Sequence, residues 1–291
     1  MFTNLHNLPD PVVRALSDDK YDSGQVNSSV TTLIDSPQVK ILNRKHKNDI
    51  TVDVSERLWS VLGTAVHTMF EDYATGDYLS EERLFAEVNG WKISGAIDIQ
   101  KAEKDGTVSI LDYKCTSVWS VIFGKSSWEQ QLNFYAWLVQ ECKGLQVSKL
   151  QILAVLRDWK QSDADFKSDY PKQPITTVDI PLWSTSQQEE FVRKRVELHQ
   201  QAEFDYLNGN PIAECTAEET WTRQTKFAVM KKGRKKAIKL FDNEADALNR
   251  VESLDSGHYV EKRQGEAVRC ERYCTAAMFC PQYQRGKNAG N

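Results

Sequence analysis

Side chains alternate between apolar and polar in two runs within residues 91–114, and an Asp-Gly pair separates the runs. A period of two is typical of β-strands, and an Asp-Gly pair between such runs is typical of a β-hairpin turn. Isoleucines occupy one face of the first run and Asp98 the other, while Asp112 and Lys114 share one face of the second run. The pattern therefore predicts a hairpin that carries two carboxylates and a lysine.

Residues 53–73 are predicted to form a helix, because apolar side chains recur there at i, i+3, i+4 and i+7 and form a single stripe. Asp53 is a predicted N-cap, with Glu56 three residues later in capping-box spacing. At about 100° per residue, His67 points roughly 150° away from the centre of the stripe, with Gly63 one turn before it. A histidine of the core would lie on the stripe, so His67 is either a solvated surface residue or faces a metal cleft.

A third periodic segment begins at Ser126, which suits a helix N-cap, and ends at Gly144, which suits the C′ position. Gln131 and Tyr135 share its apolar face. A buried amide needs hydrogen-bond partners, so Gln131 either bonds to local backbone groups or reaches toward a site. The remaining runs predict an α/β body with strands at 149–156 and 177–180 and a long polar helix at 186–207.

The two ends of the chain differ from this body. The first fifty residues are polar and irregular, with one apolar run at 30–34 that predicts a short docking helix or turn. Near the C-terminus, residues 227–239 predict a second hairpin with a basic tip, followed by a short helix at 243–252. We therefore expect three parts: an N-terminal docking segment at 1–50, the core at 51–210 and a C-terminal hairpin and cysteine segment at 211–291.

Composition narrows the class of protein. The 291 residues are 40% hydrophobic and 27% charged, with a formal net charge of −4, which suits one sizeable globular domain with an accessory segment. The charge excludes a globally basic nucleic-acid coat but allows a local patch. No run of about 18 apolar residues occurs, and the first residues lack the pattern of a secretory signal. We expect a soluble, cytoplasmic protein without a membrane contact.

Positive charge is concentrated in the tip of the second hairpin. Its members are Lys231, Lys232, Arg234, Lys235 and Lys236. Most such runs are simply solvated turns, but in a nuclease of net negative charge this patch would be the natural contact for DNA phosphates.

Three of the six cysteines, Cys270, Cys274 and Cys280, are crowded into one short stretch, with a spacing typical of metal ligands rather than of disulfides. Cys115 and Cys142 have no other cysteine at ligand spacing. We interpret both as free cysteines, which most often act as small buried apolar groups. The trio predicts a metal site, and three unligated cysteines are the alternative.

Four motifs in order resemble the RecB-like branch of the PD-(D/E)XK nuclease superfamily, which includes CRISPR-adaptation-type and phage-encoded exonucleases. They are Leu62-Gly63-Thr64-Ala65-Val66-His67, Gly95-Ala96-Ile97-Asp98, Asp112-Tyr113-Lys114 and Gln131-Leu132-Asn133-Phe134-Tyr135. The resemblance implies a restriction-endonuclease-like α/β core, in which helices flank a central mixed sheet. Any one motif arises by chance, whereas four in the correct order are specific.

The resemblance also implies roles for single residues. Mg²⁺ or Mn²⁺ would be held by His67, Asp98, Asp112 and the main-chain carbonyl of Tyr113. Lys114 would orient or deprotonate the attacking water and stabilise the transition state. Gln131 and Tyr135 would shape the catalytic site or touch the DNA backbone.

Some members of the family hold a [4Fe–4S] cluster with one cysteine near the N-terminus and three near the C-terminus. This chain has no N-terminal cysteine, and its C-x3-C-x5-C spacing is one residue longer than the usual pattern. Cys215 is the candidate fourth ligand beside Cys270, Cys274 and Cys280. An iron–sulfur cluster and a structural Zn²⁺ both fit four thiolates, and either would tie the C-terminal segment together.

These observations predict a metal-dependent DNA nuclease, and by family tendency an exonuclease, acting on single strands or duplex ends. We expect it to act in DNA replication, recombination or repair in a bacterial cell or a phage-infected host. The first alternative is a catalytically silent nucleic-acid-binding or adaptor subunit that retains the fold. The second is a zinc-bound docking segment that contacts replication or recombination proteins.

Overall fold

The computed structural model describes residues 1–18 and 25–289. As far as they are described, these residues form two compact units, one from 1–40 and 51–212 and the other from 41–50 and 213–291. Each unit is considered by itself. Within the described ranges, no helix combines the length and the apolar character that crossing a membrane requires.

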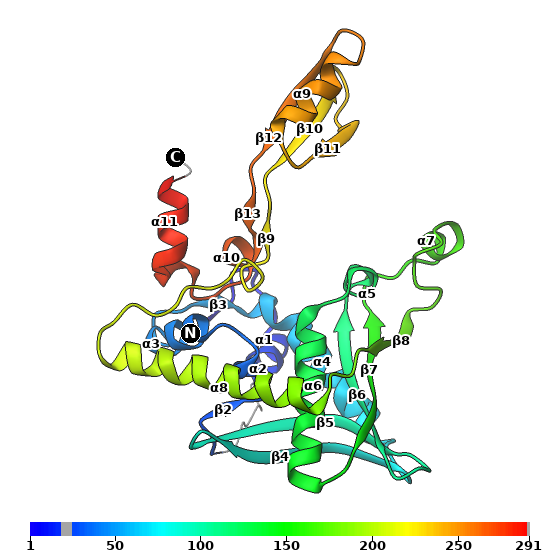
Figure 1. Cartoon of the computed structure of the whole chain (residues 1–291), viewed down its shortest axis with the longest axis vertical. Helices are drawn as coiled ribbons and strands as arrows, with labels where there is room; N and C mark the ends of the chain where they lie inside the picture. The colour runs from blue at the N-terminus through cyan, green and yellow to red at the C-terminus, as the bar shows by residue number, and fades with distance from the viewer. Residues whose placement is uncertain (19–24, 290–291) are drawn as a thin grey trace. The chain divides into compact units, whose positions relative to one another are not determined.

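The first unit is built on a mixed six-stranded sheet (Figure 1). Its strands are β2 (Ser28–Ser29), β4 (Tyr78–Val88), β5 (Trp91–Ala102), β6 (Val108–Thr116), β7 (Val147–Leu156) and β8 (Ile175–Ile180). The order is β2-β5-β6-β7-β8, with β4 pairing with β5 as well. The β2/β5 and β6/β7 pairs are parallel and the others antiparallel, which confirms the predicted mixed sheet and the first hairpin.

Helix α6 (Ser126–Lys143) lies between this sheet and the long helix α8 (Thr185–Leu207). Because α6 packs on two sides, almost every residue from its second turn to its fourth is buried. The fully buried side chains around it include Ile93, Ile97, Ile110, Leu132, Phe134, Leu138 and Ile152. The predicted end of α6 is confirmed by Gly144 with φ +66°, but Lys125 rather than Ser126 is the N-cap.

Gly95 of β5 is the point at which α6 comes closest to the sheet. A Cβ atom there would lie 2.8 Å from Leu138 Cδ1, 2.9 Å from Tyr135 Cε1 and 3.0 Å from Val30 Cγ2. The Val30 contact comes from the short helix α2 (Val30–Leu33). Glycine is required because two helices pack directly onto the backbone of the strand that carries Asp98.

The helix expected after Asp53 is α4 (Leu58–Glu71), reached through one turn of 3₁₀-helix, Val54–Arg57. The Asp53 carboxylate caps that turn by accepting a hydrogen bond from Ser55 N at 3.1 Å. Contrary to the expectation from its apolar stripe, no residue of α4 is buried, and Met69 is 52% exposed. Its polar side lines a cleft, with Thr64 and Glu71 among the lining residues, and Phe70 of the apolar stripe contacts Tyr113 of β6.

The first fifty residues contain more structure than predicted. The short helix at the apolar run is confirmed as α2, but α1 (Asp10–Ser17) and α3 (Pro37–Lys45) were not expected. Strand β1 (Phe2–Thr3) pairs with β3 (Val52–Asp53), and β2 joins the central sheet. Other elements absent from the prediction are β4, α5 (Val118–Phe123) and α7 (Gln161–Phe166).

The second unit contains the predicted basic hairpin within a three-stranded antiparallel sheet, β11-β10-β12. Its elements are β9 (Thr222–Arg223), β10 (Lys226–Lys231), β11 (Lys239–Phe241), α9 (Glu244–Glu252), β12 (His258–Arg263), β13 (Glu266–Ala267), α10 (Val268–Arg272), a 3₁₀ turn (Ala277–Phe279) and α11 (Pro281–Ala289). Asn243 caps α9 as an N-cap residue. Strand β12 was not predicted.

The close approach at Gly95 is testable by adding one methyl group. We expect Gly95→Ala to lower the free energy of unfolding by about 1–3 kcal/mol, the usual cost of overpacking a full core. Gly63→Ala in α4 is the matched control, since a Cβ at that position meets no atom within 4 Å. Thermal unfolding monitored by circular dichroism measures both variants, and equal melting temperatures would contradict this account of the packing.

Candidate active site

The separation of β5 from β6 creates the site. The two strands pair from Ala102 with Val108 to Ile99 with Leu111 and then diverge. At that point a side chain replaces the main chain as the partner of β6, since Asp98 Oδ2 accepts a hydrogen bond from Tyr113 N at 2.7 Å. The adjoining residue, Asp112, is thereby brought to the same end of the hairpin.

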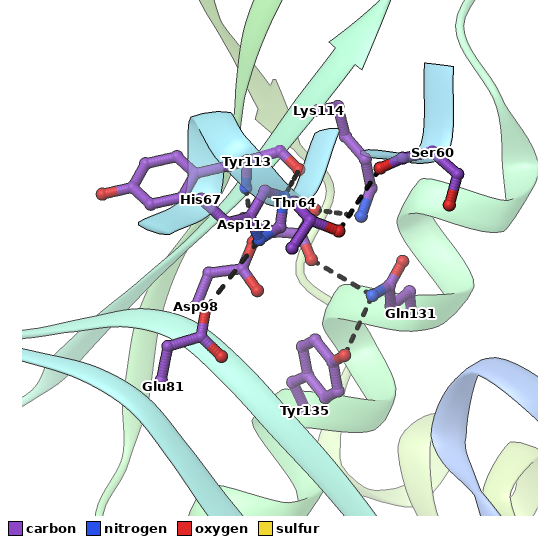
Figure 2. Close-up of polar contacts among 10 residues, drawn as sticks. All are labelled: Ser60, Thr64, His67, Glu81, Asp98, Asp112, Tyr113, Lys114, Gln131 and Tyr135. Atoms are coloured by element: carbon purple, nitrogen blue, oxygen red, sulfur yellow. Dashed lines mark hydrogen bonds and ion pairs between the residues drawn. The ribbon is translucent and has the colours of Figure 1, made fainter. Parts of the chain in front are cut away.

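Asp112 is the most deeply buried carboxylate of the site, with 1% of its side chain exposed. Its Oδ2 forms an ion pair with Lys114 Nζ, and its Oδ1 accepts a hydrogen bond from Gln131 Nε2 at 3.1 Å. Gln131 Nε2 also lies 2.9 Å from the Tyr135 hydroxyl (Figure 2). Of the two alternatives for Gln131, the structure shows the one in which the amide reaches the site.

His67 of α4 faces the same group of carboxylates rather than solvent (Figure 2). Its Nε2 donates a hydrogen bond to the Tyr113 carbonyl at 3.0 Å, and its Nδ1 lies 3.5 Å from Asp98 Oδ2 and 3.8 Å from Glu81 Oε1. Donation from Nε2 leaves Nδ1 directed at the carboxylates, where the neutral ring would offer its lone pair to a cation. A metal-binding histidine is commonly oriented in this way by a backbone carbonyl.

Glu81 is a member of the site that the sequence analysis missed. It lies in β4 between residues that pair with Ile99 and Ile97, so it faces Asp98 across the two strands. Its φ of +50° is rare for a residue with a side chain, and such conformations gather at functional sites. No motif or period marks it, and only the pairing of β4 with β5 places it here.

Burial and charge strongly perturb the ionisation of these groups. Burial, and then the neighbouring Asp112 carboxylate, raise the pKa of Asp98 to about 7. Burial alone would lower the pKa of Lys114, but Asp112 and Asp98 outweigh it and the pKa is raised. Burial likewise opposes the charged form of His67, but contact with Glu81 and the charges of Asp98 and Asp112 raise its pKa.

The site opens into a cleft of about 690 Å³, which is large enough to admit a nucleotide-sized group. The cleft is bordered by α4, β4, β5, β6 and α6 and by the start of α2. All seven residues predicted from the motifs, His67, Asp98, Asp112, Tyr113, Lys114, Gln131 and Tyr135, line it. The four motifs therefore meet in one place, although they are spread over some seventy positions of the chain.

The chemistry of the side chains fits a divalent cation. His67, Glu81 and Asp98 each offer a ligand atom, and these atoms lie within 4.8 Å of one another. Carboxylate oxygens with one imidazole suit Mg²⁺ or Mn²⁺, which prefer hard ligands. The raised pKa of Asp98 has the same physical origin, because crowded buried carboxylates favour any positive charge placed among them.

The four cysteines predicted as metal ligands and the basic tip belong to the second unit. Burial raises the pKa of the Cys270 thiol, and its neighbours Cys274 and Cys280 raise it further. The main-chain N and O of Cys215 bond to the side-chain amide of Gln282 in α11, at 3.0 and 2.8 Å. Among the residues that the structure describes, the four sulfurs do not form a group with metal-ligand separations.

The basic tip lies in the turn after β10. Lys231 pairs with Asp255 at 3.1 Å, whereas Lys232, Arg234, Lys235 and Lys236 are exposed. Neither the cysteine cluster nor this turn is assigned a function by its geometry, so both assignments stay predictions.

A model of the PD-(D/E)XK nuclease superfamily matches residues 73–281, which is well over half of the chain. The chain therefore belongs to the PD-(D/E)XK nuclease superfamily, whose members are generally nucleases. This confirms the resemblance at the level of the superfamily, together with the predicted α/β nuclease fold.

The chain is also similar to a solved structure titled "Crystal structure of SSO0001", with a TM-score of 0.42 and 17% sequence identity. The match covers 70% of this chain and 94% of that one. No curated protein matches this chain.

The electrostatics of the site can be tested without a substrate. Folding raises the pKa of Asp98, so its contribution to stability is present below the ordinary carboxyl pKa and is lost as the pH rises through about 7. In EDTA at pH 8, Asp98→Asn should therefore be more stable than the wild type, by about 2–4 kcal/mol. The gain should shrink steadily as the pH falls to 4.

Denaturant unfolding at several pH values measures this difference. Asp179→Asn, which replaces a carboxylate that is 75% exposed on β8, is the matched control and should show no such trend. A stability difference for Asp98→Asn that is independent of pH would contradict the raised pKa of Asp98, which burial and the Asp112 carboxylate together produce.

Proposed function

We propose that the protein is a divalent-metal-dependent deoxyribonuclease, and specifically an exonuclease that acts in DNA replication, recombination or repair. The observation that carries the proposal is the meeting of His67, Asp98, Asp112 and Lys114 in one open cleft. The exonuclease assignment extends the tendency of the RecB-like relatives that the motifs resemble.

His67 and Asp98 would hold the cation together with Asp112, and Glu81 is an added candidate ligand. A bound Mg²⁺ or Mn²⁺ would acidify a water molecule and offset the charge that develops on the scissile phosphate. The predicted contribution of the Tyr113 carbonyl is compatible with its bond to His67, because a carbonyl oxygen has a second lone pair.

Lys114 would act as a fixed positive charge. Proton abstraction is one conceivable role for this lysine, but its raised pKa keeps the amine protonated at neutral pH. A protonated amine beside Asp112 orients the attacking water and stabilises the charged transition state instead. Gln131 would be a positioning residue, since its amide holds Asp112 Oδ1 and is itself held by Tyr135.

The alternative of a silent adaptor is less well supported, because all the expected catalytic side chains are present and lie together. A nuclease that had lost its activity would be free to lose the lysine or a carboxylate. The ion pair of Lys114 with the buried Asp112 is costly to maintain without a function, since burial of charge opposes folding.

For the second unit we propose a [4Fe–4S] cluster, or alternatively Zn²⁺, held by Cys215, Cys270, Cys274 and Cys280. The support is the spacing of the last three and the mutual effect of their thiols on the pKa of Cys270. The basic tip after β10 would contact DNA phosphates, as its exposed charges suggest.

Cleavage of end-labelled DNA tests the main proposal. With Mg²⁺ or Mn²⁺ the wild type should shorten single strands or duplex ends, and EDTA should stop the reaction. Asp112→Asn and Lys114→Ala should each lower the rate about 100-fold or more, because each removes a group that balances charge in the transition state. Lys149→Ala, at a lysine that is 51% exposed on β7, is the control and should cleave normally.

Cleavage that survives both substitutions would refute the proposed catalytic group. Absence of cleavage by the wild type with either metal, on any DNA end, would favour the adaptor. Product sizes over time separate an exonuclease, which releases short products from the end at once, from an endonuclease.

The cysteine proposal is tested by metal analysis of the purified protein. A [4Fe–4S] cluster should give about four irons per chain and a broad absorption band in the visible range, whereas Zn²⁺ should give one zinc and no such band. Cys274→Ser should release the metal, and Cys142→Ser, at an exposed cysteine of α6, should retain it. Protein without either metal would leave the cysteines as unligated thiols.

A further inference from the structure

Two aromatic side chains on α5 are exposed and stacked on each other. Trp119 is 53% exposed and Phe123 is 78% exposed. Their ring centroids lie 5.7 Å apart with an angle of 13° between the rings. Helix α5 follows directly after β6, the strand that carries Asp112 and Lys114.

The end of β7 links this helix to the cleft. Arg157 N bonds to Thr116 O at 3.0 Å, and Asp158 Oδ1 accepts a hydrogen bond from Val118 N at 2.8 Å. The Arg157 guanidinium lies 4.6 Å from the ring centroid of Trp59, which is 49% exposed and borders the cleft. Arg157 and Asp158 therefore connect Trp59, in the wall of the active site, with the start of α5.

Positive charge accompanies the aromatic rings. Lys125 follows α5, and Arg157 precedes Asp158, which bonds to the first residue of that helix. Burial lowers the pKa of Lys125, and the charges of Arg157 and Lys114 lower it further. Arg157 and Lys125 are exposed, and within the described part of the chain neither forms an ion pair with a carboxylate. The Lys125 ammonium lies 5.6 Å from the ring centroid of Trp128. Cations that repel one another beside a cleft are stabilised by an anionic ligand.

We propose that α5, Lys125 and Arg157 form a subsite for single-stranded nucleic acid, in which bases stack on Trp119 and Phe123 and phosphates contact the two cations. Proteins that bind single strands combine these two features, aromatic platforms and a positive track. Bases inside a duplex are already stacked on their neighbours, so the platform selects unpaired strands. The inference rests on the proposed nuclease function, because Trp59 and Lys114 connect the subsite to its cleft.

A docking surface for another protein would also expose aromatic side chains. The nucleic acid is favoured because neither cation pairs with a carboxylate in the described part of the chain, and because Arg157 lies over Trp59, which lines the cleft in which the phosphodiester would be cleaved. The same chemistry suits single-stranded DNA and single-stranded RNA, and the experiment separates the two.

Binding measured in EDTA tests the stacking without cleavage. Fluorescence anisotropy with labelled oligo-dT should show about tenfold weaker binding for the double variant Trp119→Ala/Phe123→Ala, in line with measured losses for base-stacking residues. Phe204→Ala, at a side chain that is 58% exposed on α8, is the matched control and should bind like the wild type. Circular dichroism confirms that each variant is folded.

An abasic oligonucleotide of the same length retains the phosphates but has no bases to stack. The wild type should bind the abasic strand about as weakly as the double variant binds oligo-dT. The double variant should bind the abasic strand with nearly the same affinity as it binds oligo-dT. Oligo-U in place of oligo-dT shows whether RNA is bound equally, and blunt duplex DNA should bind with no effect of the double substitution.

Salt dependence tests the phosphate contacts. Arg157→Gln and Lys125→Gln should each reduce the slope of log Kd against log salt by about 0.7, the value for one contact to a single strand. Lys194→Gln, at an exposed lysine of α8, should leave the slope unchanged. Unchanged slopes for both variants would overturn the assignment of these cations.

The two proposals fail in different ways. If the wild type cleaves DNA but the double variant binds oligo-dT as tightly as the wild type, the subsite is wrong, the nuclease stands, and protein docking explains the exposed rings. If the double variant loses affinity but the wild type never cleaves, the subsite stands and the nuclease assignment fails.

Discussion

The crowding of carboxylates in one cleft is the constraint on which the rest of the site depends. Asp98 and Asp112 are both nearly buried, and Glu81 lies opposite Asp98, so each negative charge raises the cost of the others. Lys114 and His67 offset part of this repulsion, but burial and the charge of Asp112 still raise the pKa of Asp98. A divalent cation would complete the balance, which is why these residues suit a metal-dependent hydrolase.

The fold holds this arrangement by interrupting regular structure at a few positions. The β5–β6 ladder ends where Asp98 bonds to Tyr113 N, and the backbone of β4 turns to positive φ at Glu81. Behind the strand, Gly95 lets α6 lie close enough for Gln131 to reach Asp112. Packing in the core and chemistry in the cleft are therefore coupled through β5 and α6, since a shift of either element moves both.

Much of the site was predictable because its residues follow local periods. Asp112 and Lys114 share a strand face, and Gln131 and Tyr135 are one helical turn apart, so their relative directions follow from backbone geometry. The stripe of α4 predicted correctly that His67 points away from its apolar side, but not which side faces the sheet. The orientation of α4 is set by the cleft that it borders, because a helix beside an open site has no core on which to bury its apolar stripe.

The sequence by itself determined the alternating faces of β5 and β6, the helical period of α4 and α6 and the order of four motifs, because each depends on residues close together in the chain. Tertiary structure alone decided that Glu81 joins the site, that Gln131 reaches Asp112 and that Arg157 lies over Trp59. These contacts join residues from separate elements, and no local period encodes which strands pair or which helix faces the cleft. The pairing of β4 with β5 places Glu81 in the site, and the packing of α6 on Gly95 brings Gln131 within reach of Asp112.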